Sequence, residues 1–400
     1  MAAKPVLIAG AGIAGLTAAL SFARRGLAVT LLERAERLEE VGAGLQLSPN
    51  ASRVLFALGL EEALLAVAAR PEAVRLIDAR SLRELAHVPL GAWGERRWGA
   101  PYLALHRADL QRVLLDQARR TAGIELRLGA EIAGVSIGPE GAAADTSGGR
   151  VEGSFLAAAD GVNSAVRRAL LPEAQARETG LTAWRAAVGA EQASSSELGE
   201  ILPQGSVAAF LHPRVHLVAY PLRQGAAVNL VAVARTSGAA GGDEDHRSFA
   251  HAFRNAAPAL AEVAADRKPW TAWPLRIAPP RLPWAFDGRA ALIGDAAHAM
   301  TPFAAQGAAM AVEDAATLAS AFIAGGPSAL PRWEAERKAR IAQVLRRGML
   351  NRLTWHAWGP IRLGRDAMLK LRPPETLAAD LDWLYGWRAP GYLARSRIDT

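Results

Sequence analysis

The feature that most constrains the fold is a glycine pattern near the start of the chain, Gly10-x-Gly12-x-x-Gly15. It follows an apolar run, residues 6–9, that suits a buried parallel strand, and apolar residues then recur at helical spacing. At such a turn the first glycine permits the bend, the second lets a pyrophosphate approach the backbone, and the third allows close helix–strand packing. The pattern predicts a Rossmann-like α/β domain whose loop binds a dinucleotide through Gly10, Gly12, Ala14 and Gly15.

The next apolar strand, residues 28–32, ends in Glu33. A carboxylate at this position is placed to accept hydrogen bonds from the adenosine ribose hydroxyls, and it would repel an added 2′-phosphate. The first segment therefore fits FAD or NAD, and it cannot separate the two.

Two later segments distinguish these cofactors. Asp160-Gly161 follows the strand run 155–159, and Gly294-Asp295 ends the strand run 290–293, where open α/β sheets bind ligands. A long helix then opens at Gln306-Gly307-Ala308. Its N-terminus would stabilise the negative charge of a reduced flavin ring. In isolation Asp-Gly is a common turn, but the three segments in this order indicate FAD.

Two further positions are candidates for contact with the cofactor. The glycine-containing run that ends at Gln46 lets the chain pass close to a flat group, although a plain loop is the alternative. Arg107 opens a helix and could bind a phosphate or the flavin edge, or be a simple surface arginine.

Composition narrows the classes of protein and of binding site that the chain could form. The 400 residues predict two packed domains, or one domain with a large insertion, and the absence of cysteine excludes disulfides and thiolate metal sites. The net charge of +7 comes from basic residues that are spread along the chain, apart from a richer stretch at residues 332–372. This distribution favours a solvated helical face over a surface that binds nucleic acid. Glycines interrupt the apolar run 5–23, so we expect no membrane span and a cytoplasmic protein. We expect His298 to be structural and no metal to be bound.

Between residues 181 and 277 the pattern changes to short alternating runs, typical of a mostly antiparallel sheet inserted into the nucleotide-binding domain. His216, Val218 and Tyr220 share one face of a strand. A histidine near a phenolic ring is a reasonable general base, although His216 could be structural and His212 competes with it. Arg185 could pair with a substrate carboxylate or be an exposed strand residue.

Three motifs together resemble the single-component FAD-dependent aromatic hydroxylases. They are Gly10-Ala-Gly-Ile-Ala-Gly15, Ala159-Asp-Gly-Val-Asn-Ser164 and Gly294-Asp-Ala-Ala-His-Ala-Met-Thr-Pro302. The likeness covers nearly the whole chain. Within that family the sequence is most similar to the salicylate hydroxylase and 3-hydroxybenzoate 6-hydroxylase branch, including a tail like Trp383-Leu-Tyr-Gly-Trp387.

The resemblance implies non-covalent FAD, transient binding of NADH or NADPH, and attack of oxygen on the flavin to give a C4a-hydroperoxide that hydroxylates the substrate ring. It also implies roles for particular residues in the cofactor site: Glu33, Arg34, Gln46, Arg107, Asp160, Asp295, Gly307 and Ala308.

At the substrate, the resemblance assigns contacts to His216 and Tyr220, whose spacing is similar to a pair in the 3-hydroxybenzoate branch. Pro302 could fix the loop against the flavin, and Phe303 could line the pocket. Pro302 differs from the polar residue that this branch carries in the loop, which leaves the exact substrate open.

The sequence thus predicts an FAD-binding domain from residues 1–180 and 278–345, a substrate domain from 181–277 and a helical C-terminal segment from 346–400. The predicted reaction is hydroxylation of a small phenolic acid by a monomer or homodimer. Two alternatives are a monooxygenase or epoxidase that tailors a larger natural product and an FAD oxidoreductase that does not oxygenate.

Overall fold

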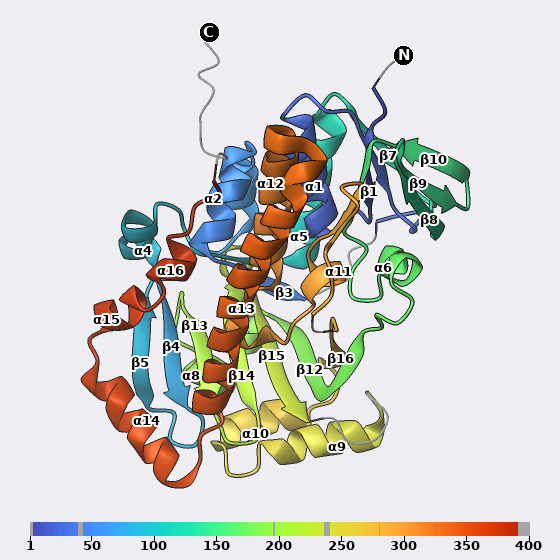
Figure 1. The fold of residues 1–400 in the computed structure, drawn as a ribbon. Helices are drawn as coiled ribbons and strands as arrows, with labels where there is room; N and C mark the ends of the chain where they lie inside the picture. Colours follow the sequence, from blue (N-terminus) through green and yellow to red (C-terminus); the bar gives the residue numbers. More distant parts are fainter. Residues whose placement is uncertain (1–2, 39–42, 195–196, 236–240, 280, 391–400) are drawn as a thin grey trace.

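A computed structural model describes residues 3–38, 43–194, 197–235, 241–279 and 281–390 of the chain. The fold contains two large sheets, one in each half of the molecule, and the long helices of the C-terminal part run beside both (Figure 1). The predicted α/β class with a helical C-terminal end is confirmed. The last part of the predicted C-terminal segment, 391–400, lies outside the described residues.

The first sheet has six strands in the order β17-β18-β11-β1-β2-β7, and all of its pairs are parallel except β17 with β18. Its four inner strands are short apolar runs that are buried along their whole length, as expected for a sheet covered on both faces. The strands are β1 (Val6–Ala9), β2 (Val29–Leu32), β7 (Ile124–Arg127), β11 (Phe155–Ala158), β17 (Ala285–Phe286) and β18 (Ala290–Leu292).

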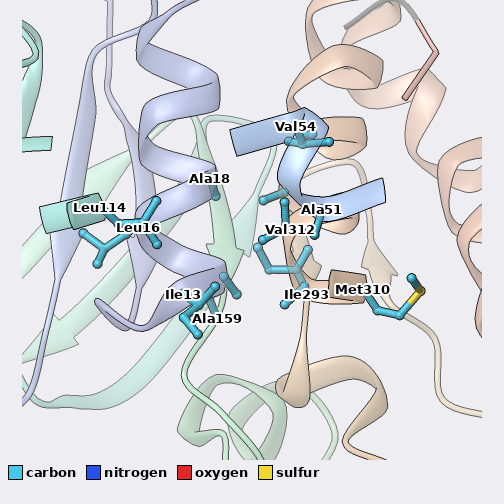
Figure 2. Packing of buried hydrophobic residues seen from close by; sticks show 14 of the residues in the cluster. Ile13, Leu16, Ala18, Ala51, Val54, Leu114, Ala159, Ile293, Met310 and Val312 are labelled. Atoms are coloured by element: carbon cyan, nitrogen blue, oxygen red, sulfur yellow. The ribbon is translucent and has the colours of Figure 1, made fainter. Parts of the chain in front are cut away.

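Helix α1 (Ile13–Ala23) lies in the core of this half, between α5 (Arg107–Arg120) and α12 (Gly307–Gly325). Because neighbours surround α1, ten of its eleven residues are buried. Figure 2 shows side chains of the core cluster, with Ile13 and Leu16 on α1, Leu114 on α5 and Val312 on α12. Further elements of the first half are α2 (Pro49–Ala57), α3 (Glu61–Val67), α4 (Gly91–Trp98), α6 (Ala165–Leu170) and α11 (Asp295–His298).

Two small antiparallel sheets complete the first half. One carries the strand with Gln46, and the other is a meander at its edge (Figure 1). They consist of β3 (Gly44–Leu47) with β6 (Leu103–His106), and of β8 (Ile132–Gly138), β9 (Gly141–Thr146) and β10 (Gly149–Gly153).

The second large sheet has seven strands in the order β16-β12-β15-β14-β13-β4-β5, and its only parallel pair among the described strands is β13 with β4. Strands β4 and β5 come from residues 73–89, far from the predicted range 181–277, so two separate stretches of chain build this sheet. The strands are β4 (Ala73–Asp78), β5 (Glu84–Pro89), β12 (Arg177–Gly189), β13 (Val207–Leu211), β14 (His216–Leu222), β15 (Ala227–Arg235) and β16 (Thr271–Ile277).

Helices cover one face of this sheet, where Phe249, Phe253 and Leu260 form a second apolar core with Leu217 and Ala219 of β14. The alternate residues of β14, His216, Val218 and Tyr220, therefore lie on the opposite face of the strand. The helical elements of this region are α7 (Ala190–Ser194), α8 (Glu197–Ile201), η1 (Arg223–Gly225), α9 (Asp243–Ala252) and α10 (Pro258–Ala265).

The C-terminal helices return to the first half. Arg340 donates hydrogen bonds to the carbonyls of Trp383 and Leu384, and Arg53 donates to those of Trp98 and Trp387, which holds the tail against α2 and α4. The remaining elements are η2 (Pro302–Ala304), η3 (Gly326–Ala329), α13 (Leu330–Trp355), α14 (Gly359–Leu371), α15 (Pro374–Ala379) and α16 (Asp382–Tyr385).

Among the described residues, one helical stretch, Gly307–Trp355, is long and apolar enough to cross a membrane, and 56% of its most apolar window is buried inside the fold. Many of its apolar side chains, such as Val312, belong to the main core (Figure 2), whereas Leu350 and Leu353 near its end are exposed. The absence of a membrane span stays a prediction.

Candidate active site

The glycine loop joins β1 to α1, and its three glycines meet different surroundings. A Cβ on Gly15 would lie 1.8 Å from the carbonyl oxygen of Gly10, so only glycine permits this approach of helix to strand. A Cβ on Gly12 would meet no atom within 4 Å. The loop is therefore packed tightly at Gly15 and faces open space at Gly12, which is the arrangement a backbone cradle for a phosphate requires.

Two side chains fix this loop from outside. Glu33, at the end of β2, accepts hydrogen bonds from the backbone N–H of Ala11 at 2.7 Å and of Ala35 at 3.0 Å. Gln111 of α5 donates to the carbonyl of Ala11 at 2.8 Å. Glu33 is predictable from its place after a strand, whereas Gln111 is not, because a glutamine in the middle of a helix carries no motif of its own.

Asp160 follows β11 and offers a buried acceptor. Its Oδ2 accepts a hydrogen bond from the backbone N–H of Val166 at 3.1 Å, whereas its Oδ1 is buried and has no partner in the described chain. Burial raises the pKa of this carboxyl group above its ordinary value. A buried carboxylate oxygen without a donor fits a ligand hydroxyl, since such atoms are almost always hydrogen-bonded in folded proteins.

No hydrogen bond or ion pair joins Arg167 to Asp160 among the described residues, although the charge of Asp160 interacts with Arg167. Its guanidinium group is buried and donates to three carbonyl oxygens, those of Val162, Ala174 and Ala296. The bond to Ala296 measures 2.6 Å and ties the loop after β11 to α11. Arg167 thus holds the Asp160 and Asp295 segments together.

The Gly294-Asp295 segment follows β18. Asp295 is exposed while its neighbours Gly294 and Ala296 are buried, so its carboxylate lies at the surface of an otherwise packed loop. Gly307 opens α12, and a Cβ there would meet no atom within 4 Å. Asp295 and the start of α12 are accordingly free to contact a bound group.

A buried network of charged side chains supports this segment from behind. Asp314 of α12 accepts from the backbone N–H of Gly294 at 2.9 Å and from Arg337 at 2.7 Å, and it lies 2.5 Å from His298 Nε2. The neighbouring Glu313 pairs with Arg337 and Arg340. His298 therefore orders the loop through a carboxylate, as the sequence predicted in outline.

Hydrogen bonds also fix the N-terminus of α12. Gln306 is buried and donates to Ser48 Oγ at 3.0 Å, and Asn50 donates to Glu313 at 2.7 Å. Ser48 and Asn50, at the start of α2, were not predicted from the sequence because their partners lie more than 250 positions away.

Gln46 and Tyr220 come together where β3 crosses the second sheet. Tyr102 donates to Gln46 Oε1 at 2.5 Å, and the phenol of the buried Tyr220 interacts with the side chains of Gln46 and Asn229. Burial raises the pKa of the Tyr220 phenol. A Cβ on Gly44 would lie 2.8 Å from the Tyr220 ring, so glycine allows the two sheets to meet here.

Arg185 of β12 lies close to both sheets. Its Nε is buried without a partner in the described residues, and its guanidinium group lies 5.7 Å from the centroid of the Trp273 ring. Burial lowers the pKa of Arg185, and its charge interacts with Tyr220, Arg107 and Asp295. Arg185 is thus half-buried and not an exposed strand arginine, and its charge interacts with residues predicted at the site.

His216 lies at the other end of the same strand face as Tyr220, ~13 Å along β14. Its ring is 5.1 Å from that of Phe303 in the loop before α12, and its Nδ1 lies 3.0 Å from His356 Nε2. Burial and the neighbouring His356 lower the pKa of His216 to about 3. His212, its competitor, lies in the turn between β13 and β14, with Nε2 buried and without a partner in the described chain.

The other predicted positions are placed as follows. Pro302 begins η2 next to the buried Phe303, and Asn351 of α13 donates to the Phe303 carbonyl at 2.9 Å. The remaining residues are the exposed Arg34 and Arg107, the half-buried Ala308 and the buried Ala14.

These donors and acceptors fit FAD. Three features lie at one edge of the first sheet, on segments that follow the parallel strands β1, β11 and β18. They are the loop that faces open space at Gly12, the unpaired Asp160 oxygen and the open start of α12. They offer, in turn, backbone N–H groups for a pyrophosphate, an acceptor for a hydroxyl group, and a positive helix end for the flavin ring. Residues 3–348 match the family described as "FAD binding domain".

The chain belongs to this family of FAD-binding proteins. Its FAD-binding match covers most of the chain and includes all the cofactor residues predicted from the sequence. FAD is therefore the cofactor of the fold.

Relatives extend over nearly the whole chain. A 3-hydroxybenzoate 6-hydroxylase from Polaromonas naphthalenivorans is 34% identical, with 98% of each chain covered. A 3-amino-4-hydroxybenzoate 2-monooxygenase from Streptomyces cremeus is 35% identical, over 95% of this chain and 94% of the relative. Both names describe monooxygenation of a hydroxybenzoate.

Solved structures share the fold. Klebsiella pneumoniae HpxO complexed with FAD and uric acid has a TM-score of 0.82 at 23% identity and covers 96% of each chain. A salicylate hydroxylase substrate complex has a TM-score of 0.79 at 22% identity, covering 98% of this chain and 97% of that one. The predicted family is confirmed.

Proposed function

We propose that this protein is an FAD-dependent monooxygenase that uses NADH or NADPH and O2 to hydroxylate a small aromatic acid bearing a phenol group. The relatives that match nearly the full length are named for hydroxybenzoates, which supports this substrate class. The observation that carries the proposal is the strand face of β14, where His216 meets the Phe303 loop and Tyr220 meets Gln46 and Arg185.

The chain's own residues would hold the cofactor. When bound, FAD supplies the chemistry that passes electrons from the nicotinamide to oxygen. Its pyrophosphate would lie on the glycine loop, its adenosine ribose at Glu33 with Arg34 nearby, and its hydroxyl groups at Asp160 and Asp295. Gln46, Arg107 and the start of α12 at Gly307 and Ala308 complete the proposed site.

Arg185 is the proposed partner of the substrate carboxylate. A guanidinium group offers two parallel N–H donors that match a carboxylate, and the unpaired Nε of Arg185 would gain an acceptor. The interaction of its charge with Asp295 and Arg107 supports a substrate carboxylate that lies close to the proposed flavin site.

His216 is the proposed base for the substrate phenol, and Pro302 and Phe303 shape the loop around the ring. A phenolate is a better nucleophile than a phenol towards an electrophilic oxygen, so removal of the proton favours the reaction. Tyr220, whose phenol interacts with Gln46 and Asn229, would orient the ring from the other end of the strand.

The proposed domain division follows the predicted one: residues 1–180 and 278–345 for FAD, 181–277 for substrate and 346–400 for the C-terminal helices. We add β4 and β5 to the substrate side because they pair within the second sheet. A cytoplasmic monomer or homodimer that binds no nucleic acid completes the proposal.

A panel of hydroxybenzoates tests this function through NADH and NADPH oxidation by the FAD-loaded protein. At least one phenolic acid should stimulate oxidation, and its uncharged carboxamide should stimulate much less. Arg185→Met should raise KM for the acid about 10-fold or more and leave KM for the carboxamide nearly unchanged. Equal changes in KM for both compounds would show that Arg185 does not bind the carboxylate. If no phenolic acid in the panel stimulates oxidation, the proposed substrate class is contradicted.

A further inference from the structure

His216 is not isolated in the fold. Its Nδ1 makes a 3.0 Å hydrogen bond with Nε2 of His356, which immediately follows the last residue of α13. Within the described chain its Nε2 has no hydrogen-bond partner. One nitrogen of this buried ring is thus committed to a second histidine, and the other is left for a substrate.

The two histidines differ in their access to water. The side chain of His216 is 3% exposed, whereas His356 is only half-buried. The rings of Phe303 and Trp355 flank His216 at centroid distances of 5.1 Å each, and Phe303 also meets the His356 ring at 5.9 Å. The hydrogen-bonded pair therefore runs from an apolar enclosure towards the surface.

A base in this position cannot easily keep a proton. Burial and the neighbouring His356 both oppose a positive charge on His216. Arg352 and His212 face His356, while Arg80, Arg214 and Asp78 surround His212. A proton accepted by His216 must leave as it arrives.

We infer that His216 and His356 form a proton relay that carries the proton of the substrate phenol from the buried site to solvent. The phenol O–H bond breaks as a proton binds His216 Nε2, while the Nδ1 proton of His216 passes to His356 Nε2. His356 then releases its own Nδ1 proton to water. Transfer in the reverse direction when the product leaves restores both tautomers, so neither ring holds two protons for long.

This inference rests on the proposed function and makes His356 a positioning residue that acts through His216. The test uses the FAD-loaded protein and a nitro-substituted hydroxybenzoate, whose phenolate absorbs visible light. A stopped-flow pH jump measures how fast the bound phenol ionises, without turnover. A titration of the same complex gives the midpoint of ionisation at equilibrium.

His356→Gln and His356→Phe should slow ionisation of the bound phenol about 10-fold or more and shift its midpoint little, because a relay changes a rate. His251→Gln on α9, an exposed histidine far from the site, is the matched control and should behave as the wild type. Unchanged rates in both His356 variants would overturn the relay.

A measurement on the wild type covers the case in which the variants do not fold. In mixtures of H2O and D2O the ionisation rate should depend on deuterium fraction along a curve, as two protons in flight require, and a straight line would contradict the relay. If the ligand does not bind at all, the proposed function fails and the relay fails with it. If it binds and ionises at the same rate in every variant, the relay alone fails.

Discussion

Single residues decide whether this chain can bind its cofactor, and the glycine loop shows this most sharply. Gly12 and Gly15 lie in one loop and are both glycine, yet a side chain at each would meet a different obstacle. At Gly15 the obstacle is the protein's own backbone, whereas at Gly12 it is the proposed pyrophosphate.

The two alanine variants should therefore separate folding from binding. Gly15→Ala should lower the free energy of unfolding of the FAD-free protein by about 1–3 kcal/mol, because the added methyl group overlaps the Gly10 carbonyl. Gly12→Ala should keep that stability and weaken FAD binding about 10-fold or more. Urea unfolding and quenching of flavin fluorescence measure the two quantities. A Gly12→Ala protein with unchanged FAD affinity would place the phosphate elsewhere.

At the scale of elements, α12 and α13 are joined by buried charges that also support the Gly294 loop. Arg337 pairs with both Glu313 and Asp314, and all three side chains are at most 3% exposed. Removal of one partner from a buried ion pair leaves an uncompensated charge, which costs far more than loss of a surface pair.

Arg337→Met should lower the free energy of unfolding by about 3–5 kcal/mol. Arg332→Met provides the control, because Arg332 is on the same helix and pairs with Glu336 in full contact with water, where the pair contributes little. Urea denaturation of the three proteins measures the difference. Similar stability of the two variants would contradict the role of the buried network.

The histidines at the junction of β13, β14 and α13 should make stability depend on pH. Burial lowers the pKa of His216 to about 3 and those of His212 and His356 to about 4. The unfolded chain, with histidine pKa values of about 6.5, binds more protons than the folded one, so acid favours unfolding. This contribution is fully present above about pH 6.5 and is lost as the pH falls towards 4.

Melting temperatures between pH 7.5 and 5 test this account. The wild type should lose stability over that range, and a His216→Gln, His356→Gln double variant should lose less. The same slope in both proteins would mean that these histidines are protonated in the folded state.

At the scale of the whole molecule, the sequence predicted the segments of the proposed cofactor site but not the contacts between distant segments. The glycine loop, the strand before Asp160 and the loop after β18 are local patterns in which residue type and spacing specify the backbone. No local sequence pattern predicts that β4 and β5 pair within the second sheet, because the pairing depends on how distant parts of the chain pack together. Gln111 and His356 were missed for the same reason, since each acts through a partner at least 100 positions away.

The most direct test of the central claim is the fate of molecular oxygen. The FAD-loaded protein, NADH or NADPH and the phenolic acid that best stimulates oxidation should be incubated under ¹⁸O2, and the product analysed by mass spectrometry. A monooxygenase should give a product heavier by one oxygen atom, which carries the label. An unlabelled product, or oxidation of the nicotinamide with no change in the aromatic compound, would contradict a monooxygenase acting on this substrate class.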